Sequence, residues 1–459
     1  MITMLQTHEK LHEKYIDSKY IFNKKLSFIF IQFFLLSIIV IPHFIYVTLQ
    51  LSSFAPGIVI VLSSCILFLL ILFHRYGVHY PKTYLNGVLI LVFYLLFQSA
   101  QSFFLYGISK AFFSFLIILF YAFSLHYLRA ILAEASVKSL TQHLRITCCF
   151  LVILGLMELC FGFRGLNYSF LDKPVFPFRE HSHYALFLGP LVLALGVVSN
   201  FFLRLTLSSC LLGFALTFPN LTMLAFFVIS IILFFLDSVK KILVFAFILT
   251  ILLFSFLNFT HFDLYSNFYY FTSRLSLDAD STNLTTLVFL QGISDIKRYL
   301  LTTNFWGSGF QTMGVLGPSE ISDKIFFLAN THLNLKDGGF LAAKIISELG
   351  ITGLSLVFYY TSFIVIYFFK YLKTSIQKEK MFFSYLVGFS VEMFLRGYGY
   401  FSPSFFLALV MWFSLTFYRS HKITYCYLLI QLDAGKLDRS LEEIKPENSA
   451  LIPLFKKLS

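Results

Sequence analysis

The sequence places an acid, two imidazoles and a guanidinium side by side in the segment FREHSHYALFLGP. Arg179, Glu180, His181 and His183 directly precede an apolar run, and Ser182 is the expected N-cap of the helix that begins there. The N–H groups of a helix start favour an anion, and arginine offers a planar fork for phosphate oxygens. A neighbouring carboxylate or imidazole can move a proton. We therefore predict Glu180 and His183 as catalytic residues and Arg179 as an anion-binding residue; the alternative is an interfacial anchor at a span end.

Further cations stand at the ends of apolar runs and in the polar stretch 259–350. We predict that they bind a diphosphate or glycan together with Arg179: Arg164, Arg274, Arg298, Lys336 and Arg396. His332 precedes a helix start within the same stretch, and we predict it as a third catalytic residue. A solvated loop histidine is the alternative interpretation.

Two ion pairs are predicted from helical spacing. Lys344 and Glu348 stand at i and i+4, as do Glu392 and Arg396, so that each pair shares a helix face. An ionisable pair at the end of a membrane span is a functional hypothesis, and mutual neutralisation for structural reasons is the alternative.

Metal and nucleotide signals are weak in this chain. Asp278 and Asp280 form a DxD, but a three-residue match in an acidic loop is more typical of a solvated surface than of a metal site. WGSGFQTMG lacks the GxxxxGK[ST] pattern of a phosphate-binding loop. We therefore predict neither a metal nor a cofactor.

The elements that position these residues are apolar runs of near-bilayer length. Hydrophobic residues make up 58% of the 459 residues and charged residues 13%, and the mean hydropathy is +0.80. The net charge of +12 lies mostly in short connections, where Lys and Arg act as topology signals rather than as a nucleic-acid surface. The fold class that follows is an all-α polytopic membrane protein, and a nucleic-acid partner is excluded.

Hydropathy and charge together predict about 12 transmembrane helices with both termini in the cytoplasm. The chain divides into a cytoplasmic segment 1–26, helices one to nine in 27–258 with an outer loop at 163–182, a large outer loop 259–350, helices ten to twelve in 351–418, and a cytoplasmic tail 419–459. The ninth helix is expected at 242–258, the connection containing Arg129 at 129–145, and a break in the apolar run 339–369 at LGITG.

Two segments resemble a known family. REHSHYALFLGPLVLALG resembles the E-P-S-H-[FY]-A-L segment of Wzy-type O-antigen (oligosaccharide repeat-unit) polymerases, and GSGF followed by NLKDGGFLAAKIISELGITG resembles their later segment. Arg298 and Gly309 match an Arg-x10-Gly pattern of the family's outer loops. His181 stands where the family motif has Pro, and Arg179 is followed by Gly189 one residue too early for the same pattern.

The resemblance implies a GT-C-like fold in the bacterial inner membrane, with both longer loops in the periplasm. It implies metal-independent glycosyl transfer, in which a glycan on undecaprenyl diphosphate moves onto an incoming lipid-linked repeat unit. Membrane lipid and a chain-length regulator protein are the further partners implied. Two alternatives stay open: an O-antigen ligase that transfers glycan to lipid A-core, and a lipid-linked oligosaccharide flippase or other transporter, which predicts shorter outer loops and charges deep within spans.

Overall fold

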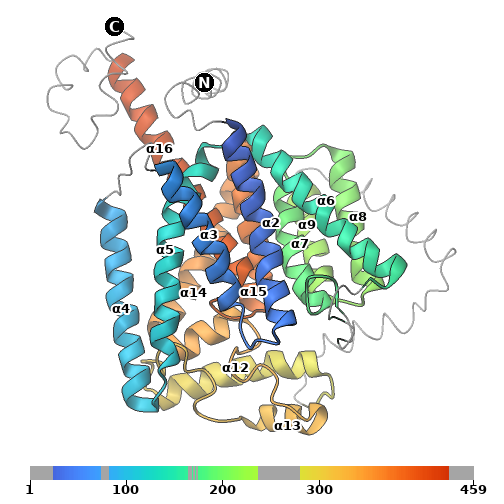
Figure 1. The fold of residues 1–459 in the computed structure, drawn as a ribbon, viewed down its shortest axis with the longest axis vertical. Coiled ribbons are helices and arrows are strands. Elements are labelled where there is room, and N and C mark those ends of the chain that lie inside the picture. The colour runs from blue at the N-terminus through green and yellow to red at the C-terminus, as the bar shows by residue number, and fades with distance from the viewer. Residues whose placement is uncertain are drawn as a thin grey trace.

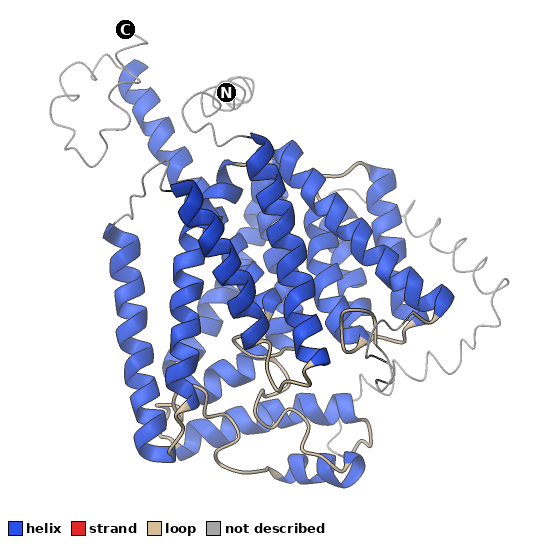
Figure 2. Cartoon of the chain, in the orientation of Figure 1, coloured by secondary structure: helices blue, strands red, loops and turns tan. Residues whose placement is uncertain are grey.

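The computed structural model describes residues 24–73, 82–163, 174–235 and 280–433, together with Tyr168 and Leu171. Within these ranges the regular secondary structure is helical, apart from one isolated bridge between Val175 and Phe178 (Figure 2). The expected ninth helix at 242–258 and both chain ends lie outside the described residues.

The helices form where the apolar runs stand in the sequence. The first group is α2 (Lys24–Thr48), α3 (Ala55–Phe73), α4 (Lys82–Tyr106), α5 (Lys110–Glu134), α6 (Val137–Phe161), α7 (His181–Gly196), α8 (Phe201–Thr217) and α9 (Leu221–Phe235). The second group is α12 (Leu284–Thr302), α13 (Glu320–Ala329), α14 (Leu341–Lys373), α15 (Gln377–Phe394) and α16 (Pro403–Asp433). Five of these, α2, α4, α5, α6 and α14, are long and apolar enough to cross a membrane, which makes the chain an all-helical membrane protein.

One connection is shorter than predicted. Helix α5 continues through Arg129 to Glu134, and α6 begins at Val137, so the expected connection 129–145 shrinks to two residues. The Ser136 side chain accepts a hydrogen bond from the Ser139 N–H and caps α6, which allows the new helix to start at once. The charges predicted to lie in this connection, those of Arg129, Lys138 and Arg145, lie within helices, and Arg129 is buried.

Connections between helices gather at two ends of a bundle (Figure 1). We call one end the loop face: it carries residues 49–54, 107–109, 174–180 and 395–402, with α12 and α13 lying across it. Helix α2 begins, and α16 ends, at the opposite face.

Helix α7 lies at the centre of the bundle. Every residue from His183 to Gly196 is buried, as expected for a helix that is apolar on all sides and surrounded by others. It packs most extensively on α15, where Gly388 brings the α15 backbone close to Pro190. The start of α7, and with it Glu180, is thereby fixed at the loop face.

Helix α14 is broken where the LGITG segment predicts. Gly350 has φ +59° and ψ −132°, so the helical hydrogen bonds that would span it are missing. The chain at residues 305–309 fills the break: Ser308 N–H donates to Ser347 O at 3.2 Å, Gly309 N–H to Glu348 O at 2.9 Å, and Ile351 N–H to Phe305 O at 2.8 Å. A non-helical stretch within an apolar helix is thereby satisfied by protein.

Gly350→Ala is expected to destabilise the protein by at least about 2 kcal/mol. A left-handed φ costs a non-glycine residue roughly 1–2 kcal/mol, and the new Cβ would collide with the Phe305 carbonyl oxygen. Thermal unfolding of the purified protein measures the loss. Gly213→Ala is the matched control, because nothing lies within 4 Å of its added Cβ inside α8. Equal unfolding temperatures for both variants would contradict the role of the break.

Candidate functional site

The centre of the site is a carboxylate held between an imidazole and a guanidinium. Glu180 Oε1 lies 2.7 Å from His183 Nε2 and 2.7 Å from Arg396 Nη2. Glu180 is the N-cap residue of α7, and Arg396 follows the end of α15, so the contact joins two elements at the loop face. Ser182 was the expected cap; instead α7 begins at His181, and no side chain caps it.

The predicted pairing of Glu392 with Arg396 is wrong. Helix α15 ends at Phe394, so Arg396 no longer stands one helical turn beyond Glu392. Glu392 is buried and accepts a hydrogen bond from the Ser402 hydroxyl instead. The guanidinium is therefore available to Glu180.

Glu180 and His183 have different roles in this centre. Burial opposes ionisation of Glu180, but Arg396 and His183 outweigh it and hold the pKa of this carboxyl well below its usual range. Such a carboxylate is a weak base and serves better to orient its neighbours. His183 donates its Nε2 hydrogen to it, which leaves a lone pair on Nδ1, and no described residue bonds that atom. His183 Nδ1, which is buried and has no hydrogen-bond partner among the described residues, is the candidate base of this centre.

A second buried imidazole, which the sequence analysis missed, faces His183. The His43 ring on α2 lies 6.5 Å from the His183 ring, centroid to centroid. The Tyr398 ring stands edge-on to the His183 ring, with 4.1 Å between their centroids. His43 Nδ1 bonds Ile39 O at 2.8 Å, and its Nε2 has no partner among described residues. The only signal in the sequence was a histidine next to Pro42 within an apolar run.

A polar cavity of about 60 Å³ opens beside this centre. It shares Phe54 and Tyr398 with the surroundings of His183. Tyr46 also lines it, and Arg179 donates to the Tyr46 hydroxyl at 3.0 Å. Its other lining residues are Ser52, Ser53, Lys110, Gln311, Asp337, Lys344, Tyr400 and Phe401. Lys110 was not predicted, although a lysine in an outer connection breaks the charge rule used for topology and could have identified it.

Lys344 and Glu348 form the predicted pair, and Lys344 also lines the polar cavity. The Lys344 ammonium lies 3.3 Å from Glu348 and 3.6 Å from Asp337. Glu348 is fully buried and accepts the N–H groups of Gln311 at 2.9 Å and Met313 at 3.0 Å. The backbone of the glycine-rich segment WGSGFQTMG therefore donates to the Glu348 carboxylate, which holds the segment against α14. This contact fixes the side of the cavity that Gln311 lines.

Arg298 has a different environment from the one predicted. Its guanidinium donates to Gly317 O at 2.7 Å and Pro318 O at 2.9 Å, and it lies 3.2 Å from Asp295 on the preceding turn of α12. None of these residues lines the polar cavity. The contacts fix the turn between α12 and α13.

The contacts of His332 and Lys336 do not include Glu180 or His183. The His332 ring stacks on Phe326 at 4.6 Å, and its Nδ1 lies 3.1 Å from the Ser322 hydroxyl, so it packs against α13. Lys336 has an exposed side chain, and its carbonyl oxygen accepts from Lys344. The predicted residues Arg164 and Arg274 lie outside the described residues.

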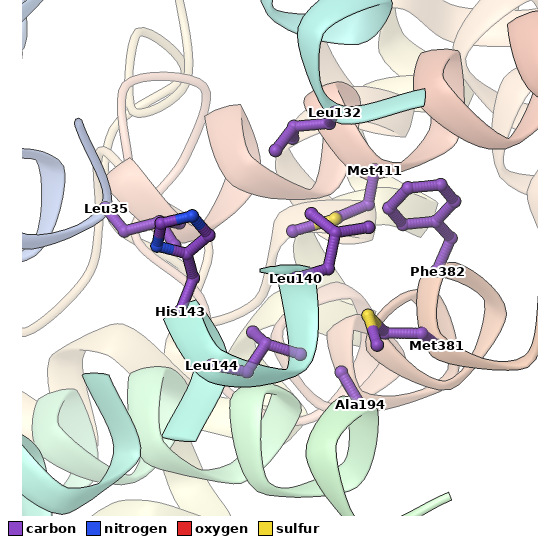
Figure 3. Close-up of a pocket in the computed structure, with 9 residues that line it drawn as sticks. All are labelled: Leu35, Leu132, Leu140, His143, Leu144, Ala194, Met381, Phe382 and Met411. Atoms are coloured by element: carbon purple, nitrogen blue, oxygen red, sulfur yellow. The ribbon is translucent and has the colours of Figure 1, made fainter. Parts of the chain in front are cut away.

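Two other places in the described ranges lack the features of a ligand site. In the described ranges, no three His, Cys, Asp or Glu side chains gather as metal ligands; Asp278 is not described, and Asp280 lies 3.7 Å from Lys324. Figure 3 shows a second cavity, of about 20 Å³, lined by apolar residues and His143. His143 is already bonded to Gln32 at 3.0 Å, and this volume holds about one water molecule.

The fold and the site together define a helical membrane protein with a cationic, aromatic-lined polar cavity at one face. Comparisons with protein-family models, curated proteins and solved structures found no match.

Asp295→Asn is expected to raise the thermal stability at pH 8 and to leave it nearly unchanged at pH 4. Burial raises the pKa of Asp295 from 3.8 to about 6, with Arg298 opposing the shift. The folded form then binds the proton more tightly than the unfolded form, so this stabilisation is complete below pH 3.8 and is lost as the pH rises through about 6. The asparagine side chain does not ionise, so the variant does not lose stability in this way over this pH range. Unfolding temperatures measured from pH 4 to 8 test it, and parallel curves for wild type and variant would contradict it.

Proposed function

We propose that this chain is a bacterial inner-membrane glycosyltransferase that polymerises oligosaccharide repeat units carried on undecaprenyl diphosphate. The proposal includes about 12 transmembrane helices, cytoplasmic termini, a GT-C-like arrangement and a loop face that lies in the periplasm. The observation that carries it is the convergence of Arg179, Arg396 and Lys110 with the His183–Glu180 pair at one end of an apolar bundle.

The reaction follows from these groups. The hydroxyl of the terminal sugar attacks the anomeric carbon of the donor glycan and loses its proton to His183 Nδ1. The bond between that carbon and the diphosphate oxygen breaks, and the lipid diphosphate leaves with the electron pair. Arg396, Arg179 and Lys110 offset its developing charge, which is the role a metal plays in other transferases. Glu180 orients His183 and stabilises the imidazolium that forms.

The tyrosines of the cavity fit a carbohydrate substrate. Tyr46, Tyr398 and Tyr400 present flat apolar rings, which suit the faces of sugars, beside hydroxyl and amide groups that suit their edges. A sugar ring is larger than the present cavity, so substrate entry requires neighbouring side chains to move apart.

The site disfavours transport as the activity. The charged residues described above gather at the loop face rather than along a path through the bundle, and α12 and α13 add a large structure there. A ligase uses the same donor and the same chemistry, so the two transferases differ in the acceptor and are separated by the product.

Deleting the gene is expected to replace the lipopolysaccharide ladder by core carrying a single repeat unit, because one unit can still be ligated but cannot be extended. Gel electrophoresis of lipopolysaccharide shows this directly, and the wild-type gene should restore the ladder. Core without any repeat unit would contradict polymerisation, and long lipid-linked polymer accumulating in that strain would identify a ligase.

Arg396→Ala is expected to reduce the ladder at least tenfold at normal protein levels, because it removes a phosphate-binding cation and leaves Glu180 with one partner fewer. Arg298→Ala is the matched comparison: it should lower the amount of folded protein, because the turn at Gly317 loses its donor. Complementation by Arg396→Ala would remove this residue from the site. An Arg298→Ala protein that is stable but inactive would instead give Arg298 the substrate contact.

A further inference from the structure

A second candidate anion site lies on α5, five residues before the helix ends at the opposite face from Glu180. Arg129 is only 8% exposed, and its contacts in the described ranges are with one imidazole and two aromatic rings rather than with a carboxylate. A buried charge without a counter-charge is costly in an apolar environment. The feature therefore requires a physical explanation.

Aromatic rings from two other helices surround the guanidinium. Its central carbon lies 4.3 Å from the Tyr84 ring centroid on α4 and 5.2 Å from the Phe417 ring centroid on α16. Both contacts are cation–π interactions, and they position the guanidinium without using its hydrogen-bond donors. The donors along its edge remain for another partner.

The hydrogen-bond donors along the edge of the Arg129 guanidinium are only partly used. Arg129 Nη2 donates to His126 Nδ1 at 3.1 Å, but the buried Nε has no hydrogen-bond partner among described residues. The Nε–H and one Nη–H of arginine form the fork that binds two oxygens of a phosphate or carboxylate. A buried donor without an acceptor costs as much as a lost hydrogen bond, which an anion would restore.

Two partly buried arginines on this side of the bundle are satisfied by the chain itself. Arg419 donates twice to Glu379 Oε2, at 2.6 and 3.0 Å. Arg204 donates to three carbonyl oxygens, those of Gly196, Val197 and Phe234. Arg129 differs from both, because its rigid aromatic clamp leaves one donor unused.

We propose that Arg129 binds the phosphate group of a membrane phospholipid at the end of the bundle opposite the catalytic face. The clamp includes Tyr84 near the start of α4, and the same helix exposes Leu89, Ile90 and Phe93, which are suited to acyl chains. A phosphate near the helix end, with its chains along α4, matches this arrangement of charge and apolar surface. Free phosphate offers the same oxygens without the chains, so the two sources can be separated. The site is independent of the proposed transfer reaction.

The test uses the full-length protein, purified in detergent and stripped of lipid. Added phosphatidylglycerol is expected to raise the unfolding temperature of the wild type by several degrees, and phosphatidylcholine with the same chains to raise it less. Arg129→Gln should lose at least half of the response to phosphatidylglycerol. Arg145→Gln, an exposed arginine on α6 near the same face, should keep all of it.

Inorganic phosphate at matched concentration distinguishes the source: no response supports a lipid headgroup, and a response equal to that of phosphatidylglycerol overturns it in favour of a soluble anion. An equal lipid response in wild type and Arg129→Gln overturns the site altogether. Native mass spectrometry of the wild type, purified in detergent without the lipid-stripping step, keeps the proposal testable should the variant fail to fold. Retained phospholipid in about one-to-one amount supports the site, and none retained contradicts it.

Discussion

The break in α14 at Gly350 is the constraint on which the loop face depends. In an apolar environment every backbone N–H and C=O needs a partner, and a helix interrupted in such surroundings exposes several of them. Residues 305–309 supply the missing bonds, and this fixes the glycine-rich segment against α14. Buried Glu348 then accepts hydrogen bonds from two backbone N–H groups of this segment and pairs with Lys344. These contacts fix Gln311 and Lys344, which line the polar cavity.

The second organising feature is the buried position of α7. A helix enclosed on every side has little freedom to shift, so the residues at its start keep their places. Arg396 reaches Glu180 from the turn after α15, the helix with which α7 packs most extensively. The geometry of the ionisable centre is thus set by apolar packing a few residues below it, and its charges need not provide the stability.

Much of this architecture could be predicted from the sequence, because the signals are local. Apolar runs predicted the helices, LGITG predicted the break, and the i, i+4 spacing predicted the Lys344–Glu348 pair. The contact of Glu180 with Arg396 spans 216 residues and depends on how α7 meets α15, which no local pattern encodes. The same spacing rule failed for Glu392, because α15 ends before Arg396. His43 lies beside His183 only through the packing of α2.

Residues 307–310 of the glycine-rich segment also bind α4, and this has a consequence for biosynthesis. Gln101 donates to Gly307 O and Ser102 to Phe310 O, across 206 and 208 residues of sequence. When α4 leaves the ribosome, its partners have not been made, and the segment that will bind it has no broken helix to dock on until Gly350 follows. Gln101 and Ser102 therefore lack these partners until 206 and 208 further residues have been added. The cavity wall is therefore among the last parts of the molecule to assemble, and a nascent chain that stops before α14 carries His183 and Glu180 without it.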